Sequence, residues 1–222
     1  MISEIIYIEI CCITIIFLVS LYSDLKYRII PNKNIKRFLF LCLLLNFIEF
    51  LLVYDNITLV LIWKISFACL IFLVSLLLFS LKIIGGSDGK LMILVFLIHP
   101  VKFLNLNFVI SFFLLLSLLF CSCFFFNLLY NSFFNNSISF EILFAINQNI
   151  STLKQIYLKI FCNFTILAKI YNFEDNKKIM IYSYIIYNIY RNRFQSLVQY
   201  RIPFVLIIMF SYYLVIFLNL GI

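Results

Sequence analysis

The chain has 222 residues, of which 65% are hydrophobic and only 12% are charged. A soluble domain carries roughly a quarter charged residues, so this composition excludes a water-soluble globule. The net charge of +8 does not indicate nucleic-acid binding, because the basic residues are scattered along the sequence instead of being gathered on one soluble module.

Apolar runs recur along the chain at lengths close to the ~20 residues that cross a bilayer as a helix. They predict six transmembrane helices at residues 5–22, 38–54, 58–81, 91–104, 108–130 and 203–220. The first run is interpreted as a retained helix, because Glu4 and Glu9 stand where a signal peptide carries basic residues. The expected fold class is an all-α polytopic membrane protein with about six transmembrane helices and a cytoplasmic insert before the last.

These runs divide the chain into three predicted regions. Residues 1–130 form a membrane domain with five helices, residues 131–202 form the insert, and residues 203–222 form the final transmembrane helix. The segment 179–190 of the insert is dense in Ile and Tyr, which suits a strand or an interfacial segment, so the fold of the insert stays open. The cysteines fall mostly in apolar runs and are interpreted as small packing residues.

The basic residues are distributed unevenly between the predicted loops. Most of the 17 Lys and Arg residues fall after the first predicted helix, after the third, or before the sixth. The positive-inside rule places these loops in the cytoplasm and both termini outside, for a multi-pass protein of the cell membrane. Anionic lipid headgroups are the expected partners of the loop cations.

Two short polar clusters interrupt the apolar sequence. Asp24 closes the first predicted helix and Asp88 opens the fourth, so both are expected at the cytoplasmic face. Two neighbouring carboxyl groups cannot both ionise cheaply, and they tend to share one proton. The ionised group can then take a proton from water while the protonated group polarises a scissile carbonyl, as in an aspartyl protease.

Glycine is concentrated around the second aspartate. Gly85, Gly86 and Gly89 are three of only four glycines in the chain. Because glycine permits close backbone approach, this segment is interpreted as a place where a substrate backbone can come near Asp88.

Both clusters resemble motifs of the type IV prepilin and archaeal preflagellin peptidases. Residues 85–91 read GGSDGKL and resemble the signature G-x-G-D-x-K-L. Asp24 with the downstream Arg28, Pro31 and Asn32 resembles an aspartate followed by R-x-I-P-N, and residues 201–204 resemble the start of the family's last helix. The compact chain is similar to the members that act as peptidases only.

The resemblance implies a membrane aspartyl endopeptidase that removes the short basic leader from pilin-like or archaellin precursors at the cytoplasmic face. Asp24 and Asp88 would be its catalytic residues, and no cofactor or metal is implied. The residues implied to support them are Gly85, Gly86, Ser87, Gly89, Lys90, Arg28, Pro31 and Asn32. Neither the particular precursor nor the oligomeric state follows from the sequence.

Other interpretations remain open at this stage. Asp24 would also suit a helix end paired with Arg28, and Asp88 would suit a helix N-terminus favoured by the helix dipole. A transporter could use both aspartates as cation or proton sites. A degenerate relative would bind precursors without cutting them, because Ser87 replaces the glycine that the family has directly before this aspartate.

The remaining polar residues of the apolar runs are interpreted as structural. Glu49 is expected at the outer interface, and Lys64 is expected to extend to the same outer surface. Arg28 and Lys90 are expected mainly to anchor the cytoplasmic face. His99 stands alone, and no His, Cys and Asp residues have the spacing of metal ligands.

Overall fold

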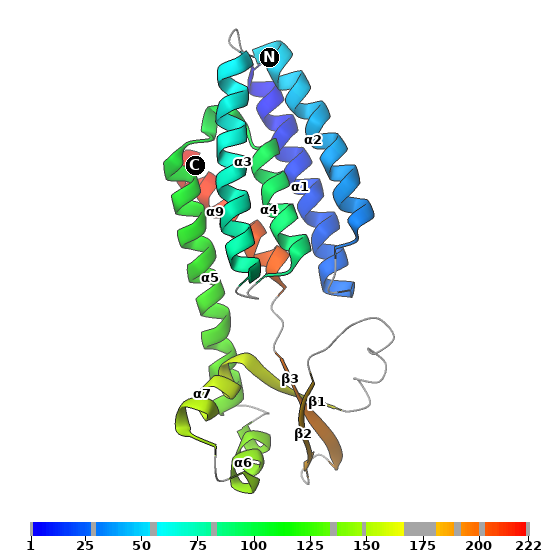
Figure 1. The fold of residues 1–222 in the computed structure, drawn as a ribbon, viewed down its shortest axis with the longest axis vertical. Helices are drawn as coiled ribbons and strands as arrows, with labels where there is room; N and C mark the ends of the chain where they lie inside the picture. Colours follow the sequence, from blue (N-terminus) through cyan, green and yellow to red (C-terminus); the bar gives the residue numbers. More distant parts are fainter. Residues whose placement is uncertain are drawn as a thin grey trace. The chain divides into compact units, whose positions relative to one another are not determined.

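A computed structural model of the chain describes residues 2–27, 30–53, 57–80, 84–133, 137–147, 150–166, 181–188, 192–199 and 203–220. The chain divides into two compact units (Figure 1). The membrane unit comprises Met1–Ser117 with Pro203–Ile222, and the second unit is Leu118–Ile202. The second unit thus begins within a helix, ahead of residue 131, where the sequence places the start of the insert.

The membrane unit is helical throughout its described residues. Its elements are α1 (Ile2–Tyr27), α2 (Asn32–Val53), α3 (Ile57–Ser80), α4 (Gly86–Ile98), the 3-10 helix η1 (Val101–Phe103), the first part of α5 (Leu106–Phe133), and α9 (Phe204–Leu220). Helix α4 contacts α1, α2, α3 and α9. Most of its side chains are buried, as expected for a helix that is apolar all round and lies inside a bundle.

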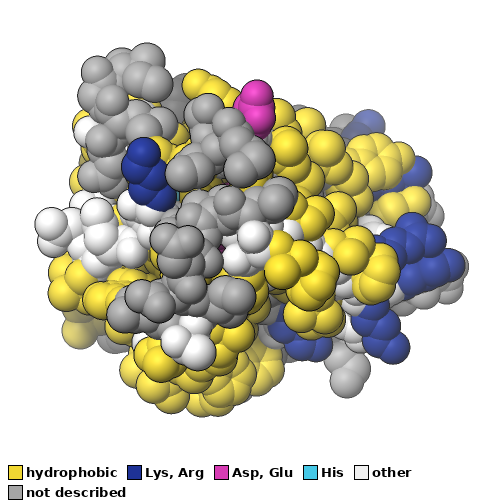
Figure 2. Space-filling view, turned by 90° about the horizontal axis from the view of Figure 1, so that it is seen from above, with side chains coloured by type: hydrophobic (Ala, Val, Ile, Leu, Met, Phe, Trp, Pro, Cys, Tyr) yellow, Lys and Arg dark blue, Asp and Glu magenta, His cyan; other side chains and the backbone are white. Residues whose placement is uncertain are grey.

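The surface of the membrane unit is strongly apolar. Large side chains such as Phe40 and Phe47 on α2 and Leu73 on α3 are exposed. Hydrophobic side chains also cover most of the described surface in the view of Figure 2. Because soluble proteins rarely expose continuous apolar surface of this extent, lipid is the medium that this surface suits.

Each of the six predicted transmembrane segments overlaps a helix of the structure. Among the described residues, three helical segments are long and apolar enough to cross a membrane: Glu4–Tyr27, Val60–Ser80 and Leu106–Phe133. The chain is therefore a helical membrane protein. That α2, α4 and α9 also cross the membrane stays a prediction.

The second unit combines helices with a small sheet. It contains the end of α5, α6 (Ser137–Ile146), α7 (Thr152–Phe161), β1 (Cys162–Ile166), β2 (Ile181–Asn188) and β3 (Arg193–Gln199). The strands are antiparallel in the order β1-β3-β2. Phe140, Leu158, Phe164 and Leu197 form part of its core. The all-α expectation thus describes the membrane unit, whereas the insert adds a sheet that includes part of segment 179–190.

Candidate active site

Asp24 lies in the last turn of α1 and is largely buried. Its side chain is 8% exposed. The preceding residues at successive steps of three or four positions are also buried: Ser20, Phe17 and Ile13. Residues three and four apart share one face of a helix. Asp24 therefore belongs to the inward-facing stripe of α1, and not to its exposed face.

Asp88 lies in the first turn of α4. Its Oδ2 accepts a hydrogen bond from the backbone N–H of Gly85 at 3.0 Å, while its own backbone N–H donates to the Gly85 carbonyl at 3.1 Å. This is half of a capping box, because glycine has no side chain to return the second bond. The start of α4 thus fixes the orientation of the Asp88 carboxyl group.

Two of the three neighbouring glycines are closely packed. A Cβ atom added at Gly85 would lie 3.0 Å from Asp88 Oδ2, and one added at Gly89 would lie 3.3 Å from the Cβ of Ser75 on α3. At Gly86 the nearest atom, on Phe79, would be 3.6 Å away, which is an ordinary contact. Gly85 therefore makes room for the Asp88 carboxyl group, and Gly89 lets α4 approach α3.

The two aspartates interact electrostatically. Asp88 precedes the apolar run that begins at Leu91, and its pKa is raised from 3.8 to about 6. Burial is the main cause, the N–H of Gly85 opposes it, and the nearby Asp24 carboxylate raises the pKa further. Helices α1 and α4 are also in contact, so Asp24 and Asp88 are near enough for the charge of one carboxyl group to favour the proton on the other.

The packing around Gly85 gives a test with a matched control. Gly85→Ala is expected to displace the Asp88 carboxyl group, because the new Cβ would meet Oδ2 at 3.0 Å, and so to reduce the precursor cleavage that the sequence resemblance implies. Gly86→Ala adds the same methyl group at ordinary contact distance and is expected to keep most of the activity. Cleavage rates of the two variants in membranes, at equal chain levels, check the prediction; equal rates would contradict it.

The other predicted site residues that the structure describes are less buried than Asp24, apart from the glycines already discussed. Pro31 and Asn32 are exposed at the start of α2, where the Pro31 carbonyl accepts hydrogen bonds from the backbone N–H groups of Asn34 and Ile35. Lys90 is exposed and Ser87 is half-buried. Arg28 lies outside the described residues.

Two serines near the aspartates were not singled out by sequence. Ser20 precedes Asp24 by one turn of α1, and Ser75 of α3 faces Gly89. Both side-chain oxygens are buried and have no hydrogen-bond partner among the described residues. The i−4 spacing of Ser20 from Asp24 was the available sequence signal, whereas the position of Ser75 depends on tertiary packing.

The expectations for Glu49 and Lys64 were wrong. Both side chains are buried in the membrane unit and form an ion pair with each other, so neither reaches the outer surface. Lys64 also donates to Asn46 Oδ1 and to the carbonyl of Leu97 in the last turn of α4. An ammonium group with three acceptors inside the bundle has no need to extend to water, which is the physical reason for the difference.

These features define a helical membrane protein with two interacting aspartates contributed by α1 and α4. A sequence profile of the type IV leader peptidase family matches residues 11–126, about half of the chain and a region that contains both aspartates. The chain belongs to the type IV leader peptidase family. No match was found among the curated proteins or the solved structures.

Proposed function

We propose that the chain is an aspartic-type endopeptidase that removes the short basic leader from pilin-like or archaellin precursors, with Asp24 and Asp88 as its catalytic residues. Membership of the family implies a leader peptidase acting on pilin-like precursors in general. The observation that carries the residue assignment is the electrostatic interaction of Asp24 with Asp88. It places a second carboxyl group near one whose pKa is raised, within the region that the family profile matches.

In the proposed reaction, the ionised Asp24 accepts a proton from a water molecule whose oxygen attacks the scissile carbonyl carbon. The protonated Asp88 donates its proton to the carbonyl oxygen, which gives a neutral tetrahedral diol. Asp24 then passes its proton to the amide nitrogen as the C–N bond breaks, and Asp88 regains a proton from one hydroxyl group. Both residues return to their starting states.

The assignment of Asp88 as the acid rests on its proton affinity. With a pKa of about 6, about a tenth of the Asp88 side chains carry a proton at neutral pH, and binding of an apolar substrate segment would increase that fraction. Its bond from the Gly85 N–H holds the carboxyl group in one orientation. The site thereby needs little rearrangement to bring the acid to a substrate carbonyl.

The membrane orientation is part of the proposal. The positive-inside rule favours Asp24 and Asp88 at the cytoplasmic face, where a basic leader would remain before cleavage. The region 131–202 is proposed to lie on the same side of the membrane, because its basic residues follow the same rule. Anionic headgroups are the proposed partners of these loop cations.

A substitution at Ser87 distinguishes two hypotheses, namely that the chain cleaves precursors and that it only binds them. If the chain is a peptidase, the wild type cleaves a basic-leader precursor, and Ser87→Gly changes the rate less than tenfold, because serine is nearly as small as glycine. The measurement is the fraction of leader-free product over time, with the chain in liposomes. A wild type without activity, together with a Ser87→Gly variant that cleaves, would contradict peptidase activity of the natural sequence.

A further inference from the structure

A second group of charged side chains is buried in the membrane unit. Glu9 of α1, Glu49 of α2 and Lys64 of α3 are 1%, 2% and 3% exposed. A rise of ~1.5 Å per residue separates Glu9 from Asp24 by about 22 Å along α1. This group, named here the buried triad, is therefore distinct from the two aspartates.

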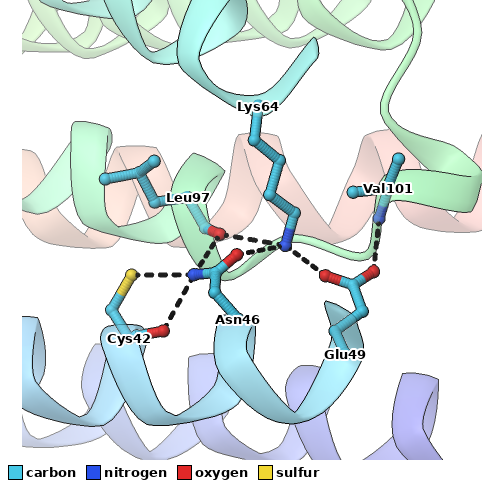
Figure 3. A network of polar contacts seen from close by, with 6 residues as sticks. All are labelled: Cys42, Asn46, Glu49, Lys64, Leu97 and Val101. Carbon is cyan, nitrogen blue, oxygen red and sulfur yellow. Dashed lines mark hydrogen bonds and ion pairs between the residues drawn. The ribbon is translucent and has the colours of Figure 1, made fainter. Parts of the chain in front are cut away.

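All three hydrogen-bond donors of Lys64 are occupied (Figure 3). Its Nζ donates to Asn46 Oδ1 at 2.6 Å, to the Leu97 carbonyl at 3.3 Å and to Glu49 Oε2. An ammonium group has three N–H bonds and no more. Lys64 therefore has no hydrogen bond left for Glu9.

The Glu49 carboxyl group uses both oxygens as acceptors. Besides the bond from Lys64, its Oε1 accepts the backbone N–H of Val101, the first residue of η1, at 3.1 Å (Figure 3). Asn46 completes this region by donating to the carbonyls of Cys42 at 2.8 Å and Leu97 at 3.1 Å. Asn46, Glu49 and Lys64 thus hold the end of α4 against α2 and α3.

Glu9 has no comparable set of donors. Neither of its carboxylate oxygens receives a hydrogen bond from the described residues, while α1 packs against α2 and the Glu49 carboxyl of α2 is near enough to interact with Glu9. Two ionised carboxylates can only accept hydrogen bonds. A bond between Glu9 and Glu49 therefore requires a proton on one of them.

The balance of charge also indicates that the buried triad carries one proton. With both glutamates ionised, the buried triad would carry one excess negative charge, and an uncompensated charge away from water is costly. One proton makes the triad neutral and supplies the missing donor. Since Glu49 already accepts from Lys64 and Val101, the proton belongs on Glu9.

We propose that Glu9 and Glu49 form a buried proton-binding site. Glu9 carries one exchangeable proton and donates a hydrogen bond to Glu49. The other titratable groups near Glu9 are Cys12 on α1, Cys42 on α2 and Tyr212 on α9. The Tyr212 hydroxyl is hydrogen-bonded to His99 Nδ1 at 2.8 Å. His99, the residue directly after α4, is near enough to Lys64 to interact with its charge.

The proton links α1 to the rest of the triad. Glu9 is the member of the triad on α1, and Glu49 and Lys64 hold the end of α4 through Leu97 and Val101. Loss of the proton would place two carboxylates against each other, one on α1 and one on α2, so these two helices would separate at this junction. This inference does not depend on the proposed peptidase activity.

Infrared spectroscopy of the full chain in liposomes tests the site. A protonated carboxylic acid has a carbonyl stretch separated from the amide bands, and the wild type at neutral pH is expected to show it. In Glu9→Gln, which has the same shape and carries no acid proton, the contribution of Glu9 is expected to be lost completely. Glu4→Gln, an exposed site on the same helix, is the matched control and should retain the band.

A second measurement needs no variant. Selective ¹³C labelling of glutamate carboxyl groups in the wild type should move this band to lower frequency, whereas labelling of aspartate should leave the Glu9 component in place. A spectrum without a glutamate-derived acid band would overturn the proposal. So would a band that disappears in sodium chloride and returns in choline chloride, because an alkali cation would then be the ligand.

Discussion

Replacing either Asp24 or Asp88 by Asn is expected to lower precursor cleavage by about 10³-fold, a loss within the range of general acid–base catalysis. Asn has nearly the same size as Asp but neither accepts nor donates the transferred proton. At position 88, an amide oxygen can still accept the N–H of Gly85, so the start of α4 should persist. The measurement is the rate of leader removal by the purified chain in liposomes.

The control for these variants is an exposed carboxylate. Glu4→Gln and Glu141→Gln remove charges at exposed positions and are expected to cleave at the wild-type rate. The double variant of Asp24 and Asp88 should be no slower than either single variant, because residues that act together lose their function together. A wild-type rate in Asp24→Asn or Asp88→Asn would show that the proposed pair is not the catalytic one.

Lys64→Met is expected to have the largest effect on stability. Removing one partner of a buried ion pair leaves the other charge uncompensated and typically costs about 3–5 kcal/mol in free energy of unfolding. Here Glu49 would lose its charged partner, and the Leu97 carbonyl would lose a donor. Unfolding by increasing SDS in mixed micelles, followed by circular dichroism, measures the change.

Lys102→Met provides the comparison for this change. Lys102 is an exposed lysine of η1, and loss of an exposed charge changes stability by about 1 kcal/mol at most. The double variant Lys64→Met with Glu49→Gln should recover part of the lost stability, because no ionised group is then stranded. Equal stability of Lys64→Met and Lys102→Met would mean that the buried ion pair does not form.

Local sequence pattern predicts the long helices well but locates their ends less well. The apolar runs correspond to α1, α3 and α5, since length and hydropathy are local properties. The fourth segment was predicted to continue to residue 104, whereas α4 ends at Ile98. Pro100 disfavours helical backbone at His99, so the apolar run continues beyond the helix that it predicts.

Interactions between distant residues are harder to predict. The pairing of Glu49 with Lys64 depends on the packing of α2, α3 and the end of α4, and no local pattern indicates that the Leu97 carbonyl accepts from the same ammonium group. The order of strands in the sheet is equally hard to predict, because β1 pairs with β3 and not with β2, the strand next to it in sequence. The polar clusters around Asp24 and Asp88, in contrast, stand out locally against an apolar background.

The pairing of Asp24 with Asp88 is tested most directly by titrating Asp88 itself. With ¹³C-labelled aspartate, NMR of the chain in micelles should give Asp88 a pKa of about 6 in the wild type, and a lower one in Asp24→Asn, where the neighbouring negative charge is gone. Glu4→Gln, at the other end of α1, should leave the Asp88 titration unchanged. An Asp88 pKa that does not respond to Asp24→Asn would contradict a shared site.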